Sequence, residues 1–428
     1  MTRDTDHGGT PERWLVAVTE YAGLTAYTGG IGSHYAALLP ALVASGRSVD
    51  LVVFSDAPLT EGAELRGVRL IRHVGLGRLP RVLALPLRAL IVRRLAARNA
   101  YDRILLAEWG GLGAALPRRA PLVTNLATSM RLSNEISALP SSALPVATRA
   151  AVAVQNRLED RQILRSAGVI PISRAMLRWA ARQYPGLPPA RVVRNCVTVN
   201  EVTVAARGRE LPTGWPEGDD PVVLFLGRLE RRKGVADAVR AFARVAERHP
   251  RARLVLAGAS GDSRFEPTRA ELLALLPEPV RQRVVWLGHV ADASLYRGIA
   301  AAAVAICPSP WEGFGNVALE IKAAGTPLVC TTGSGFDDFC VDGEDSLMVA
   351  PAHPEALAEA IGRLLDDRGL AAGLVRTASA RVLDFAPEPV ASDLAAAVDE
   401  LLAGGRSGEG RPGQGRRNQA RRSAISRR

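Results

Sequence analysis

Two carboxylates and two glycines lie close together in the segment Pro308–Val329, PSPWEGFGNVALEIKAAGTPLV. The apolar run Val304–Cys307 precedes it and is typical of a buried parallel strand, and a helix is expected to open near Asn316. Glu312 would then lie on the loop and Glu320 about one turn into the helix. Both carboxylates could face the crevice at the carboxyl end of the sheet, where open α/β sheets bind ligands.

Gly313 and Gly315 allow the backbone between these carboxylates to bend sharply and to bring bare N–H groups close to a ligand. Carboxylates accept hydrogen bonds from adjacent hydroxyls, and helix N-terminal amides donate to the remaining oxygens. The segment therefore suits a polyhydroxylated molecule. A surface loop before an acidic helix start, which the helix dipole favours, is the alternative.

A basic turn, GRLERRKG, follows the apolar run Val222–Leu226 and places Arg228 and Lys233 five residues apart. Arg offers a planar fork and Lys a compact point charge, and both suit a phosphate group. The chain has 54 basic residues, of which only Lys233 and Lys322 are lysine. Lysine in this turn therefore favours a specific role over the alternative, a solvated basic turn.

A third candidate is the turn TGGIG, which contains Gly29, Gly30 and Gly32 and lies between an expected strand at Trp14–Thr19 and an expected helix. Backbone amides and the helix dipole make such a turn an anion site. The pattern departs from GxGxxG, which argues against a nicotinamide cofactor. A tight turn also needs glycine for purely conformational reasons, so the pattern by itself is weak.

The stretch EGFGNVALE followed by AAGTPLV resembles the signature of the retaining family-four glycosyltransferases, and the GGIG turn and the basic turn fit the same family. The resemblance extends from Trp14 to about Leu402. It implies an α/β protein with the GT-B fold, in which two Rossmann-like, doubly wound domains face a central cleft.

The repeated alternation of apolar strands and helices agrees with two such domains. We expect an acceptor-binding domain at residues 1–200, a linker rich in Pro and Gly at 201–220 and a nucleotide-sugar-binding domain at 221–386. A C-terminal helix at 387–404 would cross back to the first domain. Residues 405–428 would form a disordered basic tail.

The resemblance also implies roles for the candidate residues. Arg228, Lys233 and Glu312 would be catalytic, because the two cations neutralise the departing diphosphate and Glu312 holds the donor sugar ring. Glu320 would hold the ribose hydroxyls, and backbone amides near Val290 would contact the base. The full set expected to bind the donor is Gly29, Gly30, Gly32, Val290, Gly313, Phe314, Gly315, Asn316, Val317 and Glu320.

The implied reaction moves a sugar from a nucleoside-diphosphate sugar to a hydroxyl of an acceptor sugar, glycolipid or small molecule, with retention of anomeric configuration. The leaving phosphate would take the acceptor's proton, so no dedicated base is required. No metal motif is evident, and we expect neither a metal nor another cofactor.

The chain departs from the family pattern in two places. Ala127, in NLATS, stands where the family usually carries a histidine close to the donor sugar, and Cys196 stands where glycine is usual. A strand is expected at Arg191–Val197, which contains Cys196. Of the six histidines only His34 lies near a motif, and none is an evident replacement.

Composition predicts a soluble protein. The chain has 428 residues, enough for two domain cores, and is 47% hydrophobic and 23% charged. It has neither a long uncharged apolar run nor an apolar N-terminal leader, so we expect a cytoplasmic location. Its four cysteines show no metal-ligand spacing.

Two basic segments raise the question of an anionic partner. Between Arg406 and Arg428 there are eight Arg and one Glu, so most of the net charge of +11 lies in the tail. Arg78–Asn99 mixes apolar residues with six Arg and no acid. Peripheral contact with an anionic inner membrane face is one interpretation, and a solvated tail and a core-facing helix are the alternative. We expect no specific nucleic-acid partner.

Two other functions remain open. A GT-B nucleotide-sugar epimerase or phosphorylase would use the same cleft without a separate acceptor. A non-catalytic sugar-nucleotide-binding relative would fit the loss of histidine at Ala127.

Overall fold

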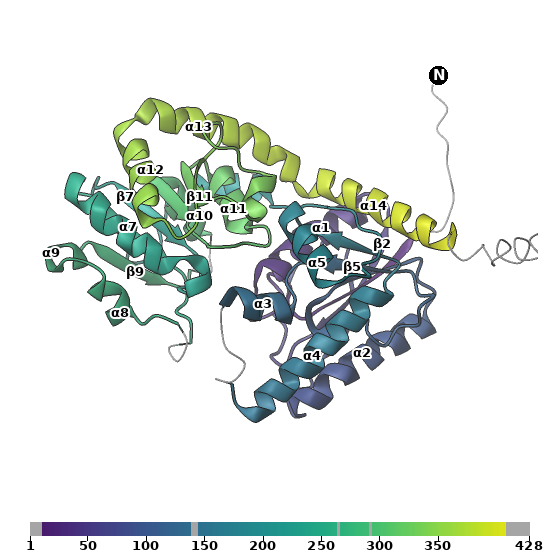
Figure 1. The fold of residues 1–428 in the computed structure, drawn as a ribbon. Coiled ribbons are helices and arrows are strands. Elements are labelled where there is room, and N and C mark those ends of the chain that lie inside the picture. The colour runs from purple at the N-terminus through teal and green to yellow at the C-terminus, as the bar shows by residue number, and fades with distance from the viewer. Residues whose placement is uncertain (1–10, 138–143, 263–265, 291–292, 408–428) are drawn as a thin grey trace, which may run out of the picture.

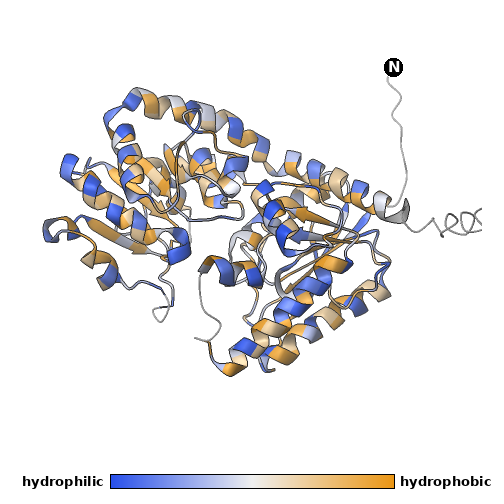
Figure 2. Cartoon of the chain, viewed as in Figure 1, coloured by the Kyte–Doolittle hydropathy of each residue, from blue (hydrophilic) through white to orange (hydrophobic). Residues whose placement is uncertain are grey.

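The computed structural model describes residues 11–137, 144–262, 266–290 and 293–407. It contains two sheets of six parallel strands, each surrounded by helices (Figure 1). This arrangement confirms the predicted α/β fold. Figure 2 shows hydrophobic residues concentrated in the strands of both sheets, as expected for parallel sheets that are covered on both faces.

The first sheet has the strand order β3-β2-β1-β4-β5-β6. Its strands are β1 (Arg13–Val18), β2 (Ser48–Phe54), β3 (Arg69–Val74), β4 (Arg103–Ala107), β5 (Leu122–Leu126) and β6 (Gly168–Pro171). The order reverses between β1 and β4, and the loops that follow these strands lie at the switch point where doubly wound sheets bind ligands.

Helices cover both faces of this sheet. On one face lie α1 (Gly30–Ala44) and α14 (Pro387–Ser407), and on the other lie α2 (Arg81–Arg98) and α4 (Val146–Arg165), which contact each other. Two further α-helices of this part are α3 (Met130–Ser137) and α5 (Arg174–Gln183), and α6 (Val199–Ala206) follows them in the chain.

The second sheet has the order β12-β11-β10-β7-β8-β9. Its strands are β7 (Val222–Leu226), β8 (Arg253–Ala257), β9 (Val284–Gly288), β10 (Val304–Cys307), β11 (Leu328–Thr331) and β12 (Leu347–Val349). Its α-helices are α7 (Val235–Arg248), α8 (Arg269–Ala274), α9 (Glu278–Arg281), α10 (Ser294–Ala301), α11 (Asn316–Ala324), α12 (Pro354–Asp366) and α13 (Arg368–Arg381). Short 3-10 turns include η3 (Arg231–Lys233) and η4 (Gly335–Asp338).

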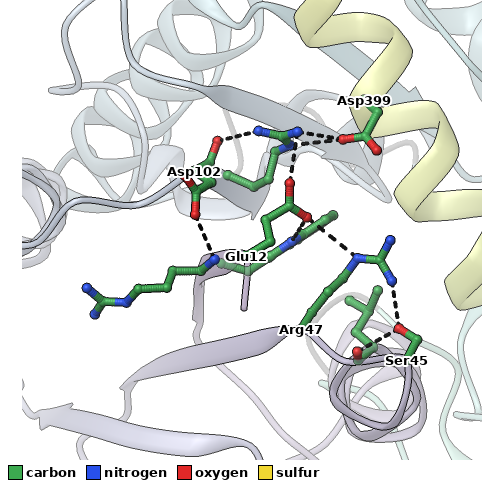
Figure 3. A network of polar contacts seen from close by, with 9 residues as sticks. Glu12, Ser45, Arg47, Asp102 and Asp399 are labelled. Atoms are coloured by element: carbon green, nitrogen blue, oxygen red, sulfur yellow. Dashed lines mark hydrogen bonds and ion pairs between the residues drawn. The ribbon is translucent and has the colours of Figure 1, made fainter. Parts of the chain in front are cut away.

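The last helix, α14, returns to the first sheet and contacts α1 and β6 (Figure 1). Gly168 explains part of the close approach, since a Cβ there would lie 2.8 Å from Cβ of Leu401. The Arg103 guanidinium also pairs with Glu12 at 2.8 Å and with Asp399 on α14 at 2.7 Å (Figure 3). The C-terminal helix is thus fixed to β4 and β6.

Two segments differ from the sequence expectations. Arg191–Val197 was expected to be a strand, but the structure has no strand there. Only an isolated bridge joins Ala190 to Val169 on β6, with Arg191 N and Val193 N donating to the carbonyl oxygens of Val169 and Pro171. The apolar side chains of Val193 and Cys196 are buried against α1 and α14. The expected linker at 201–220 begins inside α6, which packs against α10 and α11.

None of the helices in the described ranges combines the length and the apolar character that a membrane crossing needs. The predicted tail beyond Ser407 lies outside the described residues.

Candidate functional site

The first turns of two helices from the two halves of the molecule meet at the candidate site. Asn316, the first residue of α11, donates from Nδ2 to the carbonyl oxygen of Gly30 on α1 at 3.1 Å. Asn195 Nδ2 donates to Asn316 Oδ1 at 2.9 Å. The turns before α1 and α11, which sequence motifs singled out separately, are therefore neighbours.

Lys233 and Glu312 form a close ion pair at the site. Glu312 Oε1 accepts from Lys233 Nζ at 2.5 Å and from Ser309 Oγ at 2.7 Å. Burial opposes ionisation of Glu312, but the Lys233 charge and both hydrogen bonds hold its pKa below the ordinary value. An ionised carboxylate and an ammonium group therefore lie together at the loop before α11.

Arg228 extends this positive region. Its Nε lies 2.8 Å from Glu230 Oε1, and Arg232 Nε lies 2.6 Å from Glu230 Oε2. Glu230 is buried, whereas the Arg228 side chain is 45% exposed. One buried carboxylate thus orients two guanidinium groups and leaves part of Arg228 open to a ligand.

Glycine permits the close packing of the basic turn. Gly234, which ends η3 and precedes α7, has φ +72°, and a Cβ there would lie 2.0 Å from the carbonyl oxygen of Pro308. Any larger residue would push the Lys233 turn away from the Glu312 loop.

The predicted donor-sugar turn, Gly313–Gly315, is enclosed on several sides. Gly315 has φ +101°, and a Cβ there would lie 2.2 Å from the ring of Phe336. The Phe314 ring is buried, with its centroid 4.8 Å from that of Phe339. Phe314 can therefore offer a ligand only its backbone.

The first half of the molecule holds this turn directly. Ser173 Oγ donates to the Gly313 carbonyl oxygen at 2.5 Å and accepts from Met176 N at the start of α5. The backbone N–H of Arg174 donates to both carboxylate oxygens of Asp338 in η4, at 3.0 and 3.2 Å. We call these contacts the Ser173 clamp, because they fix the sugar turn to the N-terminus of α5.

Glu320 lies on α11 and is only partly exposed. Burial raises its pKa to about 7. Within the part of the chain that the structure describes, its carboxylate makes no hydrogen bond or ion pair, so its oxygens remain available to a ligand. Val317, in the first turn of the same helix, is also partly exposed.

The GGIG turn differs from an open anion site. Glu20, just after β1, accepts from Gly29 N at 3.0 Å and from Gly32 N at 2.8 Å. A Cβ on Gly29 would lie 3.1 Å from both Glu20 carboxylate oxygens, and one on Gly32 would lie 3.1 Å from Glu20 Cγ. These glycines thus allow the approach of a side chain from the same protein.

The segment that begins with Ala127 is held by two buried carboxylates. Ala127 N donates to Glu108 at 2.9 Å, and Met130 N donates to Glu159 at 2.8 Å. Burial raises the pKa of Glu108 to about 8 and that of Glu159 to about 7. A Cβ on Gly313 would lie 3.1 Å from the Ala127 carbonyl oxygen, so this backbone supports the sugar turn.

His34 does not supply the missing imidazole. It is buried on α1, where Nδ1 accepts from Cys196 N at 3.2 Å, and burial lowers its pKa to about 4. Val290 is partly exposed just after β9. No group of three or more metal-ligating side chains occurs in the described ranges.

Sequence reasoning missed the side chains that hold the motifs in place. They are Glu20, Ser173, Asn195, Glu230, Ser309 and Asp338. Ser309 and Glu230 lie inside motifs already singled out, so proximity could have indicated them. Ser173, Asn195 and Asp338 act across more than 100 residues of sequence, and Glu20 lies nine residues before Gly29, outside the GGIG motif.

Comparisons with known proteins match this architecture. A family model of glycosyl transferases group 1 matches residues 220–367, and a model of glycosyltransferase family 4 matches residues 28–201. The matches fall on the second and first sheets respectively.

Curated relatives are similar over part of the chain. A glycogen synthase from Mycobacterium tuberculosis is 33% identical over 49% of this chain and 48% of its own length. A D-inositol 3-phosphate glycosyltransferase from Acidothermus cellulolyticus is 41% identical over 39% of this chain and 38% of its own length. The chain therefore matches about half of these relatives or less.

Solved structures are similar over nearly the whole fold. Sucrose-phosphate synthase from Thermosynechococcus elongatus has a TM-score of 0.72 at 23% identity, covering 92% of this chain and 100% of the other. Anabaena HepE in complex with UDP-glucose has a TM-score of 0.62 at 20% identity, covering 90% and 99%. At these identities the likeness establishes a shared GT-B fold.

Proposed function

We propose that the chain is a family-four glycosyltransferase, which transfers a sugar from a nucleoside-diphosphate sugar to an acceptor hydroxyl. One observation carries this proposal. Lys233 and Glu312, 79 residues apart in sequence, meet at the turn before α11, while the Glu320 carboxylate one turn further on is unengaged. The Lys233 cation suits the phosphates of such a donor. The paired Glu312 carboxylate suits its sugar ring, and the free Glu320 carboxylate suits its ribose.

Arg228 and Lys233 would stabilise the departing diphosphate. Bond cleavage leaves negative charge on the phosphate oxygens, and cations fixed before the reaction stabilise that charge without reorganisation. The Glu230 carboxylate orients Arg228, and Glu312 orients Lys233. This electrostatic role supports a metal-independent reaction as our proposal.

The donor would lie across the N-terminus of α11. We assign Glu312 and the backbone of Gly313–Asn316 to the sugar ring, and Glu320 with Val317 to the ribose. Val290 would contact the base. We assign Gly30 to the donor-binding residues because its carbonyl oxygen accepts a hydrogen bond from Asn316. For Gly29 and Gly32 we propose an indirect role, because Glu20 occupies their amides.

We propose retention of configuration, with the leaving phosphate as the base that takes the acceptor proton. Support comes from the family resemblance and from the Lys233–Glu312 pair, in which the carboxylate is already engaged as an acceptor. Both matching family models describe glycosyltransferases, so an epimerase or a non-catalytic binder is not favoured.

We propose that the first sheet with α14 forms the acceptor domain and the second sheet the donor domain. A peripheral membrane contact would involve α2 and α4, which lie side by side. Leu83 and Leu90 on α2 and Val146 on α4 are exposed, and α2 carries five Arg and no acid. Such a face suits the anionic lipids of a cytoplasmic leaflet.

The membrane contact is tested by sedimentation with anionic vesicles. Replacing both Leu83 and Leu90 by Ser, or deleting residues 406–428, should weaken binding, at roughly 1 kcal/mol per Arg near the surface for the tail. Val204→Ser, at an exposed position on α6, is the control. Equal sedimentation of all variants, or salt-insensitive binding, would remove the membrane proposal.

The transferase proposal is tested first by binding. Thermal unfolding is measured with UDP-, GDP-, ADP- and TDP-sugars, because a ligand at 100 times its Kd stabilises the folded state by about 2.7 kcal/mol. The donor found in this way is then incubated with an acceptor panel. Absence of stabilisation by every sugar nucleotide would overturn the assignment.

A further inference from the structure

The two sides of the candidate site differ in hydrogen-bonding character. On the second-sheet side, Arg228 and Lys233 and the first amides of α11 are donors. On the first-sheet side, Asn195 contacts Asn316 at the start of α11, and Glu20 packs on the turn before α1, whose Gly30 carbonyl oxygen also contacts Asn316. We call Glu20 and Asn195 the acceptor wall, because their side-chain oxygens accept hydrogen bonds.

Glu20 uses up the anion-binding capacity of the α1 N-terminus. Its carboxylate accepts from Gly29 N and Gly32 N, and it also lies within reach of Ile31 N. Three donors that would otherwise attract a phosphate are therefore satisfied by a fixed carboxylate. Burial raises the pKa of Glu20 and these three amide contacts oppose that rise, so a helix start that usually attracts anions is covered by a carboxyl group here.

Asn195 adds an independent observation. The Gly30 carbonyl oxygen can only accept, so Asn316 must present Nδ2 to it and Oδ1 to Asn195 Nδ2. This order leaves Asn195 Oδ1 as an acceptor without a donor among the described residues, on a side chain that is only 6% exposed. A buried acceptor of this kind is costly unless a donor reaches it.

We propose that Glu20 determines acceptor specificity, making the first-sheet side of the cleft select a neutral, hydroxyl-bearing acceptor and reject a phosphorylated one. The inference rests on the proposed transferase function. Hydroxyl groups donate to the acceptor wall, which includes Asn195 Oδ1. A phosphate offers mainly acceptor oxygens and negative charge, so it would face repulsion from Glu20 and find the α1 amides already occupied.

The proposed selection works by repelling phosphorylated acceptors as well as by binding neutral ones. Two unit charges of the same sign at a few ångströms repel strongly in a partly buried site. The donor diphosphate avoids this repulsion by binding against Arg228 and Lys233 on the opposite side. The cleft would thus hold its anionic substrate on one side and its neutral substrate on the other.

The test uses inorganic phosphate as a probe in calorimetric titrations of the full chain. We compare the wild type with Glu20→Ala, which vacates the α1 amides, and Glu20→Gln, which removes the charge and keeps the shape. Glu61→Ala, at an exposed position in the same half, is the matched control. Phosphate that binds Arg228 and Lys233 contributes equally to all four proteins.

Glu20→Ala should bind one additional phosphate, at least tenfold more tightly than any second phosphate on the wild type. The amide resonances of Gly29 and Gly32 should shift on titration of this variant and not of the wild type. Glu20→Gln should show a smaller gain in affinity for the additional phosphate. If the alanine variant does not fold, the comparison of Glu20→Gln with the wild type tests the proposal. Equal phosphate stoichiometry in Glu20→Ala and wild type would overturn the proposal.

A second measurement connects binding to specificity. Transfer is compared between neutral polyols and their monophosphates, with the donor identified by thermal shift. The ratio of kcat/KM for neutral over phosphorylated acceptors should fall about tenfold or more in Glu20→Gln and stay constant in Glu61→Ala. An unchanged ratio would refute the role of Glu20. Failure of the transferase assignment would instead show as no sugar-nucleotide binding, while the phosphate titrations would still report on Glu20.

Discussion

The substitution Glu320→Gln should stabilise the free protein and weaken its binding of nucleoside diphosphate. Glu320 is partly buried on α11 without an ionic partner among the described residues, and burial raises its pKa to about 7. Gln has the same shape and no charge. The variant therefore removes the desolvation cost of the carboxylate together with its ability to accept from two ribose hydroxyls.

The magnitude follows from the pKa. The gap between the ordinary value of 4.5 and about 7 corresponds to roughly 3 kcal/mol. Because the folded-state pKa is raised, the folded protein binds the proton more tightly than the unfolded chain. Glu320 thus favours folding only at low pH, and stability is lost as pH rises from about 4.5 through about 7. Above that window the glutamine variant should be more stable by up to about 3 kcal/mol.

The assay combines urea denaturation with calorimetric titration of nucleoside diphosphate. Near pH 4.5 the two proteins should unfold at similar urea concentrations, and at pH 8 the variant should unfold at a higher one. Nucleotide affinity at pH 8 should fall by about 1.5 to 3 kcal/mol. Glu359→Gln, at an exposed position on α12, is the control. A variant with wild-type stability at pH 8 would refute the burial argument, and unchanged affinity would refute the ribose assignment.

Three further predictions concern the reaction. Arg228→Ala and Lys233→Ala should each lower kcat by about 10² to 10³ in steady-state assays, and near-wild-type turnover would remove the diphosphate role. Glu312→Gln should lower kcat while free nucleoside diphosphate still binds well in titrations. An equal fall in kcat and in nucleoside-diphosphate affinity would contradict the assignment of Glu312 to the sugar ring. Ser173→Ala should lower kcat by releasing the Gly313 carbonyl, with nucleotide affinity kept, and unchanged kcat would show that the clamp is dispensable.

Strands that are buried on both faces were the most predictable elements. Val222–Leu226 and Val304–Cys307 match β7 and β10 because a parallel strand covered on both sides reads as an unbroken apolar run. β3, RLIRHV, was missed because it lies at the edge of its sheet and carries exposed polar residues. Arg191–Val197 was wrongly predicted as a strand, since its backbone pairing with β6 is limited to an isolated bridge at Ala190 and two hydrogen bonds, from Arg191 N and Val193 N.

Local motifs indicated where the site lies but not how it is held. The start of α11 at Asn316 was predicted, because glycine in a turn followed by a helix-forming run is a local signal. The pairing of Lys233 with Glu312 depends on the adjacency of β7 and β10, which only the folded topology creates. The occupation of the GGIG amides by Glu20 is equally invisible, since glycine there predicts close approach without identifying what approaches.

The rarity of lysine was a less specific signal than the sequence suggested. Lys322, the other lysine, is buried on α11, donates to the Phe339 carbonyl oxygen at 2.6 Å and lies 3.0 Å from Asp345. Both lysines of this arginine-rich chain therefore contact a carboxylate in a restricted space. Lysine marks positions where a compact charge is required. The exposed part of the Lys233 side chain, and not the choice of lysine alone, supports phosphate binding.

The absence of histidine at Ala127 is compatible with an organised sugar turn. Ala127 is buried, at 5% exposure, and its methyl group offers no polar contact to a ligand. The backbone at this position is held by the buried Glu108 and in turn packs on Gly313. Ser173 fixes the Gly313 carbonyl from the other side. Because backbone contacts from the first half already position the sugar turn, the proposed donor sugar would depend on Glu312 and main-chain amides.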